Sequence, residues 1–179
     1  YHTIGKSQSE DELIYEDKQH PDRNFSAQVT HDENYLIIYG SETTSGQSLM
    51  IKDLSQTQNR FIPIVSNFDN EYSVMENIGN QFYVYTNYNA PRYKLVKVSL
   101  NNPSQDNWED ILAQKDDLLE GVSFCGNKMI SNYLVNVSSK LYLHNMSGKI
   151  EKEIILPGIC KVNGVNSSRE EENAMYSIV

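Results

Sequence analysis

The stretches NYLI at 34–37, NQFY at 80–83, NKMI at 127–130 and NAMY at 173–176 each place an asparagine before a short apolar segment. The asparagines are 46, 47 and 46 residues apart (80−34, 127−80, 173−127). Leu49, Leu95 and Leu141 repeat at the same period, 46 and 46 residues apart. A period of roughly 40–50 residues with four strands per repeat is typical of β-propeller blades. We expect each asparagine to close the turn between the first two strands of a blade, because asparagine tolerates left-handed backbone.

The remaining apolar segments are also short, rich in Tyr, Val, Ile and Phe, and bounded by Asn, Asp, Gly or Ser, which predicts an all-β fold. One polar stretch, 110–119, is compatible with a helix of one turn at most. The alternative to a propeller is a β-sandwich, which does not require a repeat. The expected strands are 13–16, 25–30, 35–40, 49–54, 61–65, 72–76, 81–87, 93–100, 108–112, 119–124, 128–135, 140–146, 150–156, 160–165 and 174–179.

This phasing predicts three complete four-stranded antiparallel blades, at 25–65, 72–112 and 119–156. Partial blades are expected at 1–16 and 160–179. Propellers typically close with about four to eight blades, so the ring is incomplete and residues 1–179 are expected to be a fragment of one propeller domain. The first residue is Tyr1 and the last residues read as a strand, which agrees with a piece of a longer chain.

Composition excludes two classes of partner. The chain has 179 residues, with 15 Lys and Arg against 24 Asp and Glu, a net charge of −9. Nucleic-acid binding depends on clustered cations, so we expect no nucleic-acid partner. The apolar runs are far shorter than the roughly 20 residues of a membrane-spanning helix, so we expect no membrane partner.

Candidate chemical groups are sparse. Cys125 and Cys160 form no C-x-x-C pair, so two buried thiols are expected, with a disulfide as the alternative. The Asn-x-Ser sequons at Asn24, Asn136, Asn145 and Asn166 are attributed to the richness of the chain in Asn and Ser.

The acidic clusters lack the spacing of a calcium loop and are expected to be solvated turns, so we expect no metal and no cofactor. These clusters are Asp11-Glu12, Asp32-Glu33, Asp116-Asp117 and Glu170-Glu171-Glu172. The four histidines are expected at exposed positions or strand edges, and no catalytic residue is assigned because the chain has no G-x-S-x-G motif. The histidines are His2, His20, His31 and His144.

Segments along nearly the whole chain resemble the prolyl oligopeptidase (prolyl endopeptidase) family of serine peptidases. The first is YHTIG at 1–5 with QSED at 8–11, similar to the "YH.LGT.QSED" segment of that family. Further matching segments are Tyr15-Glu16, HPD at 20–22, FDNEY at 68–72, TN at 86–87, APRYKLV at 90–96, NW at 107–108, GNK at 126–128, Tyr133, KL at 140–141 and EIILPG at 153–158.

The resemblance implies a partial seven-bladed propeller that covers an α/β-hydrolase domain of the same parent chain. It further implies a gating role, with short proline-containing peptides as substrates of the parent enzyme and no peptidase activity in this chain alone. Propeller loops of the family contribute to the substrate pocket, and the corresponding stretches here are 22–26 and 41–47. Both are polar, so no binding residue is carried over and a more hydrophilic pocket is expected.

Two rival functions stay open. A free-standing propeller would serve as a protein-interaction scaffold, and a glycan-binding propeller would need exposed aromatic residues in register, which Tyr35, Phe82 and Met129 do not clearly supply. Open sheet faces at the ends of an incomplete ring also predict self-association. The compartment, cytoplasmic or periplasmic, is undetermined.

Overall fold

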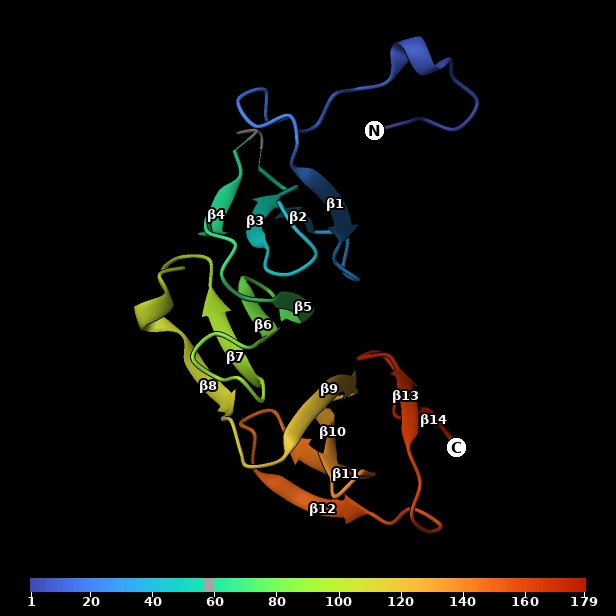
Figure 1. Cartoon of the computed structure of the whole chain (residues 1–179). Coiled ribbons are helices and arrows are strands. Elements are labelled where there is room, and N and C mark those ends of the chain that lie inside the picture. The colour runs from blue at the N-terminus through green and yellow to red at the C-terminus, as the bar shows by residue number, and fades with distance from the viewer. Residues whose placement is uncertain (57–59) are drawn as a thin grey trace.

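The computed structural model describes residues 1–56 and 60–179, and it is built almost entirely from antiparallel β-sheets (Figure 1). The predicted all-β propeller fold is confirmed, because three four-stranded sheets and one two-stranded sheet follow one another along an arc, as blades do. The first sheet consists of β1 (Asn24–Val29), β2 (Tyr35–Ser41), β3 (Ser48–Asp53) and β4 (Ile62–Val65). The second consists of β5 (Tyr72–Ile78), β6 (Gln81–Thr86), β7 (Lys94–Ser99) and β8 (Glu109–Leu112). The third consists of β9 (Leu118–Cys125), β10 (Lys128–Val135), β11 (Ser138–Asn145) and β12 (Ile150–Ile154), and the last of β13 (Val162–Ser167) and β14 (Ala174–Ile178).

The repeated asparagines take the predicted place, because Asn34, Asn80, Asn127 and Asn173 each directly precede the second strand of a sheet. The carbonyl groups of Asn34 and Asn80 accept hydrogen bonds from Leu54 and Leu100, which follow the third strands. The expected backbone conformation is wrong, however. The left-handed residue in the first three turns precedes the asparagine, as Glu33, Gly79 or Gly126.

The apolar core lies between the sheets rather than within one layer. One cluster joins the first sheet to the second and includes Ile37, Leu49 and Phe82. A second joins the second sheet to the third, and a third joins the third sheet to β13 and β14. Each sheet is therefore buried by its neighbours, which a β-sandwich of two facing layers would not produce.

One local expectation was wrong. The predicted strand at 13–16 does not form, and the first 16 residues contain only a 3₁₀ turn, Gln8–Glu10, that Ser7 and Glu10 cap. The helix-compatible stretch at 110–119 contains no helical turn, which agrees with the limit of one turn at most, and β8 and β9 occupy half of it. The 3₁₀ turn of that region is Gln105–Asn107 instead. Within the described ranges, no helix is long and apolar enough to cross a bilayer.

Candidate functional site

The first strand of every sheet, β1, β5, β9 and β13, faces the concave side of the arc (Figure 1). Two cavities, of 390 and 420 Å³, lie along these strands and share Met75, Val122 and Ser123 as lining residues. We call the two together the inner-strand groove. One end of the groove lies beside the turns that follow the inner strands, and the other lies near the starts of β9 and β13.

At the turn end, a polar contact joins the first two sheets. Asp32 accepts hydrogen bonds from Thr30 Oγ1 (2.6 Å) and from the backbone N–H of Asn34 (3.2 Å). Its other oxygen accepts a bond from Asn77 Nδ2 in β5 (2.8 Å). Burial acts to raise the pKa of Asp32, but the bonds from Thr30, Asn77 and Asn34 outweigh it and lower the pKa from 3.8 to about 2. Asp32 is therefore an ionised link between sheets and not the freely solvated turn residue that was expected.

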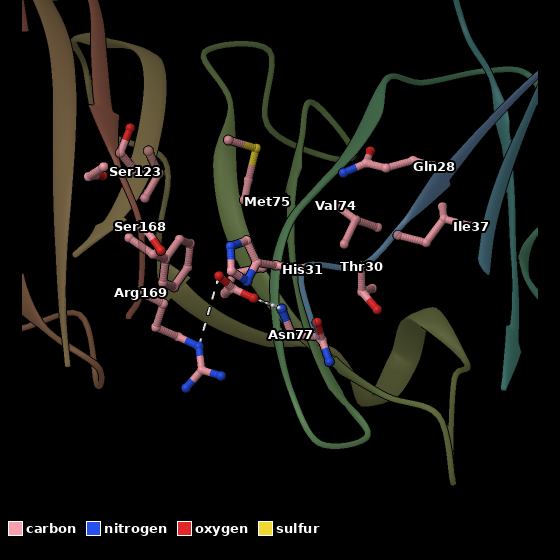
Figure 2. A pocket seen from close by; sticks show the side chains of 14 residues that line it. Gln28, Thr30, His31, Ile37, Val74, Met75, Asn77, Ser123, Ser168 and Arg169 are labelled. Atoms are coloured by element: carbon pink, nitrogen blue, oxygen red, sulfur yellow. Dashed lines mark hydrogen bonds and ion pairs between the residues drawn. The ribbon is translucent and has the colours of Figure 1, made fainter. Parts of the chain in front are cut away.

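The loop between β13 and β14 reaches across the same end of the groove (Figure 2). Arg169 Nε lies 3.9 Å from Glu76 Oε2 of β5, and Glu76 Oε1 accepts the backbone N–H of Asn77. Glu170 Oε1 lies 3.8 Å from His31 Nδ1, between two exposed side chains. Both pairs are long and partly solvated, so each contributes little stability. The loop itself is anchored on the third sheet, where Cys125 Sγ donates to the Glu171 carbonyl.

At the other end of the groove, irregular pairing places a carboxylate toward the cavity. The register between β9 and β10 shifts at Glu120, so that Gly121 faces Asn132 and Leu119 faces Tyr133. Asn132 Nδ2 donates to Glu120 Oε2 (3.4 Å), and Lys161 Nζ lies 3.3 Å from Glu120 Oε1. Bulges commonly redirect a side chain in this way beside functional sites.

The loops that the resemblance placed at a substrate pocket lie side by side. Arg23, from 22–26, donates through Nε (2.9 Å) and Nη2 (2.7 Å) to Glu42, from 41–47. Its Nη1 donates to Asp17 (2.9 Å), and the guanidinium lies 4.8 Å from the centre of the Phe68 ring. Burial acts to raise the pKa of Asp17, but hydrogen bonds from His20, from the backbone N–H of Gln19 and from Arg23 hold it below its ordinary value. The polar character predicted for both loops is therefore organised by one arginine, which the composition alone did not indicate.

Three of the four histidines lie where they were expected. His2 and His20 pair with Asp11 (2.7 Å) and Asp17 (3.0 Å), and both rings are about half exposed, as is that of His31. The expectation for His144 was wrong, because it is fully buried between strands of the third sheet.

His144 Nδ1 lies 2.9 Å from the Gly148 carbonyl, so that nitrogen carries the proton, and Nε2 accepts from Ser131 Oγ at 2.8 Å. Burial lowers its pKa. No substrate reaches this Ser–His pair, because both residues have no exposed surface.

The other candidates remain apart. Cys125 is buried and Cys160 half-buried, and both thiols are free. In the part of the chain that the structure describes, no three His, Cys, Asp or Glu side chains are arranged to hold a metal ion. Glu120, Asn132 and Arg169 were not identified as site residues from the sequence. Two glycines within short strands, Gly121 and Gly164, were the signal available for the groove, since a glycine there often marks a bulge or a close approach of another chain.

The whole chain matches a known protein family. The family model described as "Prolyl oligopeptidase, N-terminal beta-propeller domain" matches residues 1–179. The prolyl endopeptidase of Elizabethkingia meningoseptica is 32% identical over 177 residues, which is 99% of this chain and 25% of the relative. Prolyl oligopeptidase A of Amanita bisporigera is 36% identical over 154 residues, which is 83% of this chain and 20% of the relative.

A solved structure of prolyl oligopeptidase B from Galerina marginata without ligand superimposes with a TM-score of 0.89 at 24% identity. It covers 100% of this chain and 26% of the solved chain, and it supports the fold. The chain spans about a quarter of the length of the curated prolyl endopeptidases that it matches.

Proposed function

The chain belongs to the family of prolyl oligopeptidase N-terminal β-propeller domains, and from this premise we propose that it is the non-catalytic propeller portion of a serine endopeptidase. The parent enzyme cleaves short peptides after proline. Its α/β-hydrolase domain, in the same parent chain, supplies the serine, aspartate and histidine of catalysis, and the propeller limits access by size. Residues 1–179 form part of a single propeller domain in this proposal, with residues 1–16 belonging to a preceding blade.

The observation that carries the gating role is the inner-strand groove. Inner strands of all the described sheets face one concave side, so a closed ring of such blades would enclose a narrow channel there. The cavities along this side measure 390 and 420 Å³, a size suited to a few peptide residues and not to a folded protein. The family match favours this role over a free-standing interaction scaffold.

The absence of catalysis in this chain is tested with the 179-residue chain itself. A fluorogenic peptide with one proline is incubated with the purified chain, and we expect no turnover above buffer. Acyl transfer needs an accessible nucleophile beside a general base, and the Ser131–His144 pair is enclosed in the core. Turnover that a serine-reactive phosphonate blocks would contradict the proposal.

Gating is tested with the intact protein. We expect it to cleave a ten-residue peptide after proline and to leave intact a folded protein that carries X-Pro bonds on its surface. The same folded protein, once denatured and reduced to peptides, serves as the positive control. Equal cleavage of the folded and the fragmented forms would refute size exclusion.

A further inference from the structure

The end of the inner-strand groove near the starts of β9 and β13 has the backbone features of a peptide-binding cleft. Its walls are β9 and β13, which stand at the channel-side edge of their sheets and lie next to one another, linked by a hydrogen bond from Ser123 Oγ to the Val165 carbonyl (2.9 Å). Strands at a sheet edge present backbone N–H and C=O groups that an extended peptide can pair with. The pairing of β13 with β14 also shifts register, between Val162 and Gly164.

Gly121 and Gly164 keep the cleft open. A Cβ atom built on either residue would meet no atom within 4 Å, so each glycine borders empty space and not a packed neighbour. Neither glycine has the left-handed backbone that would require glycine for conformational reasons. A glycine within a strand costs stability. Where the backbone conformation does not require glycine, the close approach of another backbone is the usual reason for it.

Glu120 gives the cleft a charge preference. Its side chain is 18% exposed, and Asn132 fixes one of its oxygens, while its cationic partner Lys161 is 56% exposed at 3.3 Å. A lysine so exposed is readily displaced by another cation, whereas the carboxylate stays in place. Asn132 Oδ1 is buried and has no hydrogen-bond partner within residues 1–56 and 60–179, so an acceptor beside Glu120 is also left unsatisfied.

We propose that this cleft is a subsite that binds an extended peptide segment carrying a cationic side chain, with the backbone along Gly121 and Gly164 and the cation on Glu120. The proposal rests on the proposed function, in which peptides occupy the enclosed channel. It adds a substrate class, peptides with a lysine or arginine, and names the residue that selects for it.

The test measures binding and hydrolysis separately on the intact protein. Two fluorescein-labelled decapeptides differ only in one Lys or Gln, and both carry Ala where the substrate has Pro, so that binding is measured by anisotropy without cleavage. We expect the Lys peptide to bind about tenfold more tightly than the Gln peptide, as is usual for a charge-assisted hydrogen bond at low exposure. Glu120→Gln should remove this preference. The matched control is Glu153→Gln on β12, which makes the same chemical change on a strand away from the groove and should leave the preference intact.

Filling the cleft tests the backbone part of the proposal. Gly164→Val places its Cβ where no atom lies within 4 Å and favours strand conformation, so the thermal unfolding temperature should not fall, while both peptides should bind at least fivefold more weakly. Gly164→Ala is the milder variant if the valine variant does not fold. Equal affinity of the two peptides for the unaltered protein, or an unchanged preference in Glu120→Gln, would overturn the proposal. Hydrolysis of the Pro-containing twins is measured in parallel, so that binding as expected without any cleavage would refute the proposed function alone.

Discussion

β1 and β5 occupy the same position in consecutive sheets, yet β1 is exposed along its whole length, whereas three of the seven residues of β5 are buried. All six residues of β1 are exposed, whereas Tyr72, Val74 and Asn77 of β5 are buried. The first sheet covers one face of β5, since Tyr72 and Val74 belong to the cluster that joins the first two sheets, while no sheet in the described parts of the chain covers the corresponding face of β1. Burial in this fold therefore depends on the neighbouring sheet more than on the composition of the strand.

The exposed side of the first sheet keeps the apolar character of an interface. Phe25, Val29 and Leu36 line a cavity of 570 Å³ there, and the segment that precedes β1 covers it in part, with the Tyr15 and Phe25 rings 5.0 Å apart. At the other end of the arc, Met175 and Tyr176 of β14 are also exposed. The self-association expected from such open faces stays a prediction.

The largest expected effect on the free energy of unfolding comes from replacing a phenylalanine by alanine, at a buried interface between sheets and on an exposed sheet face. Phe82 has no exposed surface and packs edge to face on Tyr35 across the first interface (5.0 Å), whereas Phe25 is 38% exposed. Phe82→Ala should lower the free energy of unfolding by about 3–5 kcal/mol, because it leaves a cavity between sheets. Phe25→Ala should cost about 1 kcal/mol. Urea unfolding followed through the fluorescence of the single tryptophan, Trp108, measures both, and equal losses would contradict the role assigned to the neighbouring sheet.

The polar link at the same interface should respond to acid. The pKa of Asp32 in the folded chain is about 2, below its unfolded value of 3.8, so its stabilisation is present above pH 3.8 and is lost as the pH falls toward 2. We expect Asp32→Asn to lower the free energy of unfolding by about 1 kcal/mol at pH 7, a value already reduced for the partial exposure of the carboxylate. The difference from the unaltered chain should vanish near pH 2.

The control for this prediction is Asp116→Asn, in the exposed loop before β9. It should leave the free energy of unfolding unchanged at pH 7 and at pH 3. A loss at pH 7 as large as that of Asp32→Asn would show that general charge balance, and not the contact with Asn77, is responsible.

The sequence predicted features that depend on residues close together in the chain better than features that depend on distant segments. The repeat of asparagines and leucines located the strands, because the asparagines make hydrogen bonds within one sheet and the leucines take the same place in each successive cluster between sheets. The turn conformation was misassigned because asparagine and its predecessor both tolerate left-handed backbone, and only the structure shows that Glu33, Gly79 and Gly126 adopt it. Burial of His144 could not be read from alternation, since polar and apolar residues share that strand.

The candidate site was less predictable than the fold. Glu120 reaches the groove because one residue of register shifts between β9 and β10, and a one-residue shift has no signature in a single sequence. Arg169 meets Glu76 only because sheets distant in sequence converge on the concave side. The loops at 22–26 and 41–47 were recognised as polar, but the contact through Arg23 depends on their spatial proximity.

The smallest expected effect lies at a turn that no neighbouring sheet covers. Asn136 and Val137 connect β10 to β11 with φ of 48° and 65°, so both residues of this two-residue turn are left-handed, and Val137 is 89% exposed. A β-branched side chain is strained there and gains nothing from burial. Val137→Gly should therefore raise the free energy of unfolding by about 0.5 kcal/mol, the relief of strain exceeding the added freedom of the unfolded chain. The reciprocal change, Gly126→Ala, keeps only ordinary contacts around its Cβ and should cost about 1 kcal/mol through the backbone alone. A lower free energy of unfolding for Val137→Gly in the same urea measurement would contradict this prediction. It would mean that the exposed tip of the hairpin contributes packing, as only the interfaces between sheets are expected to do.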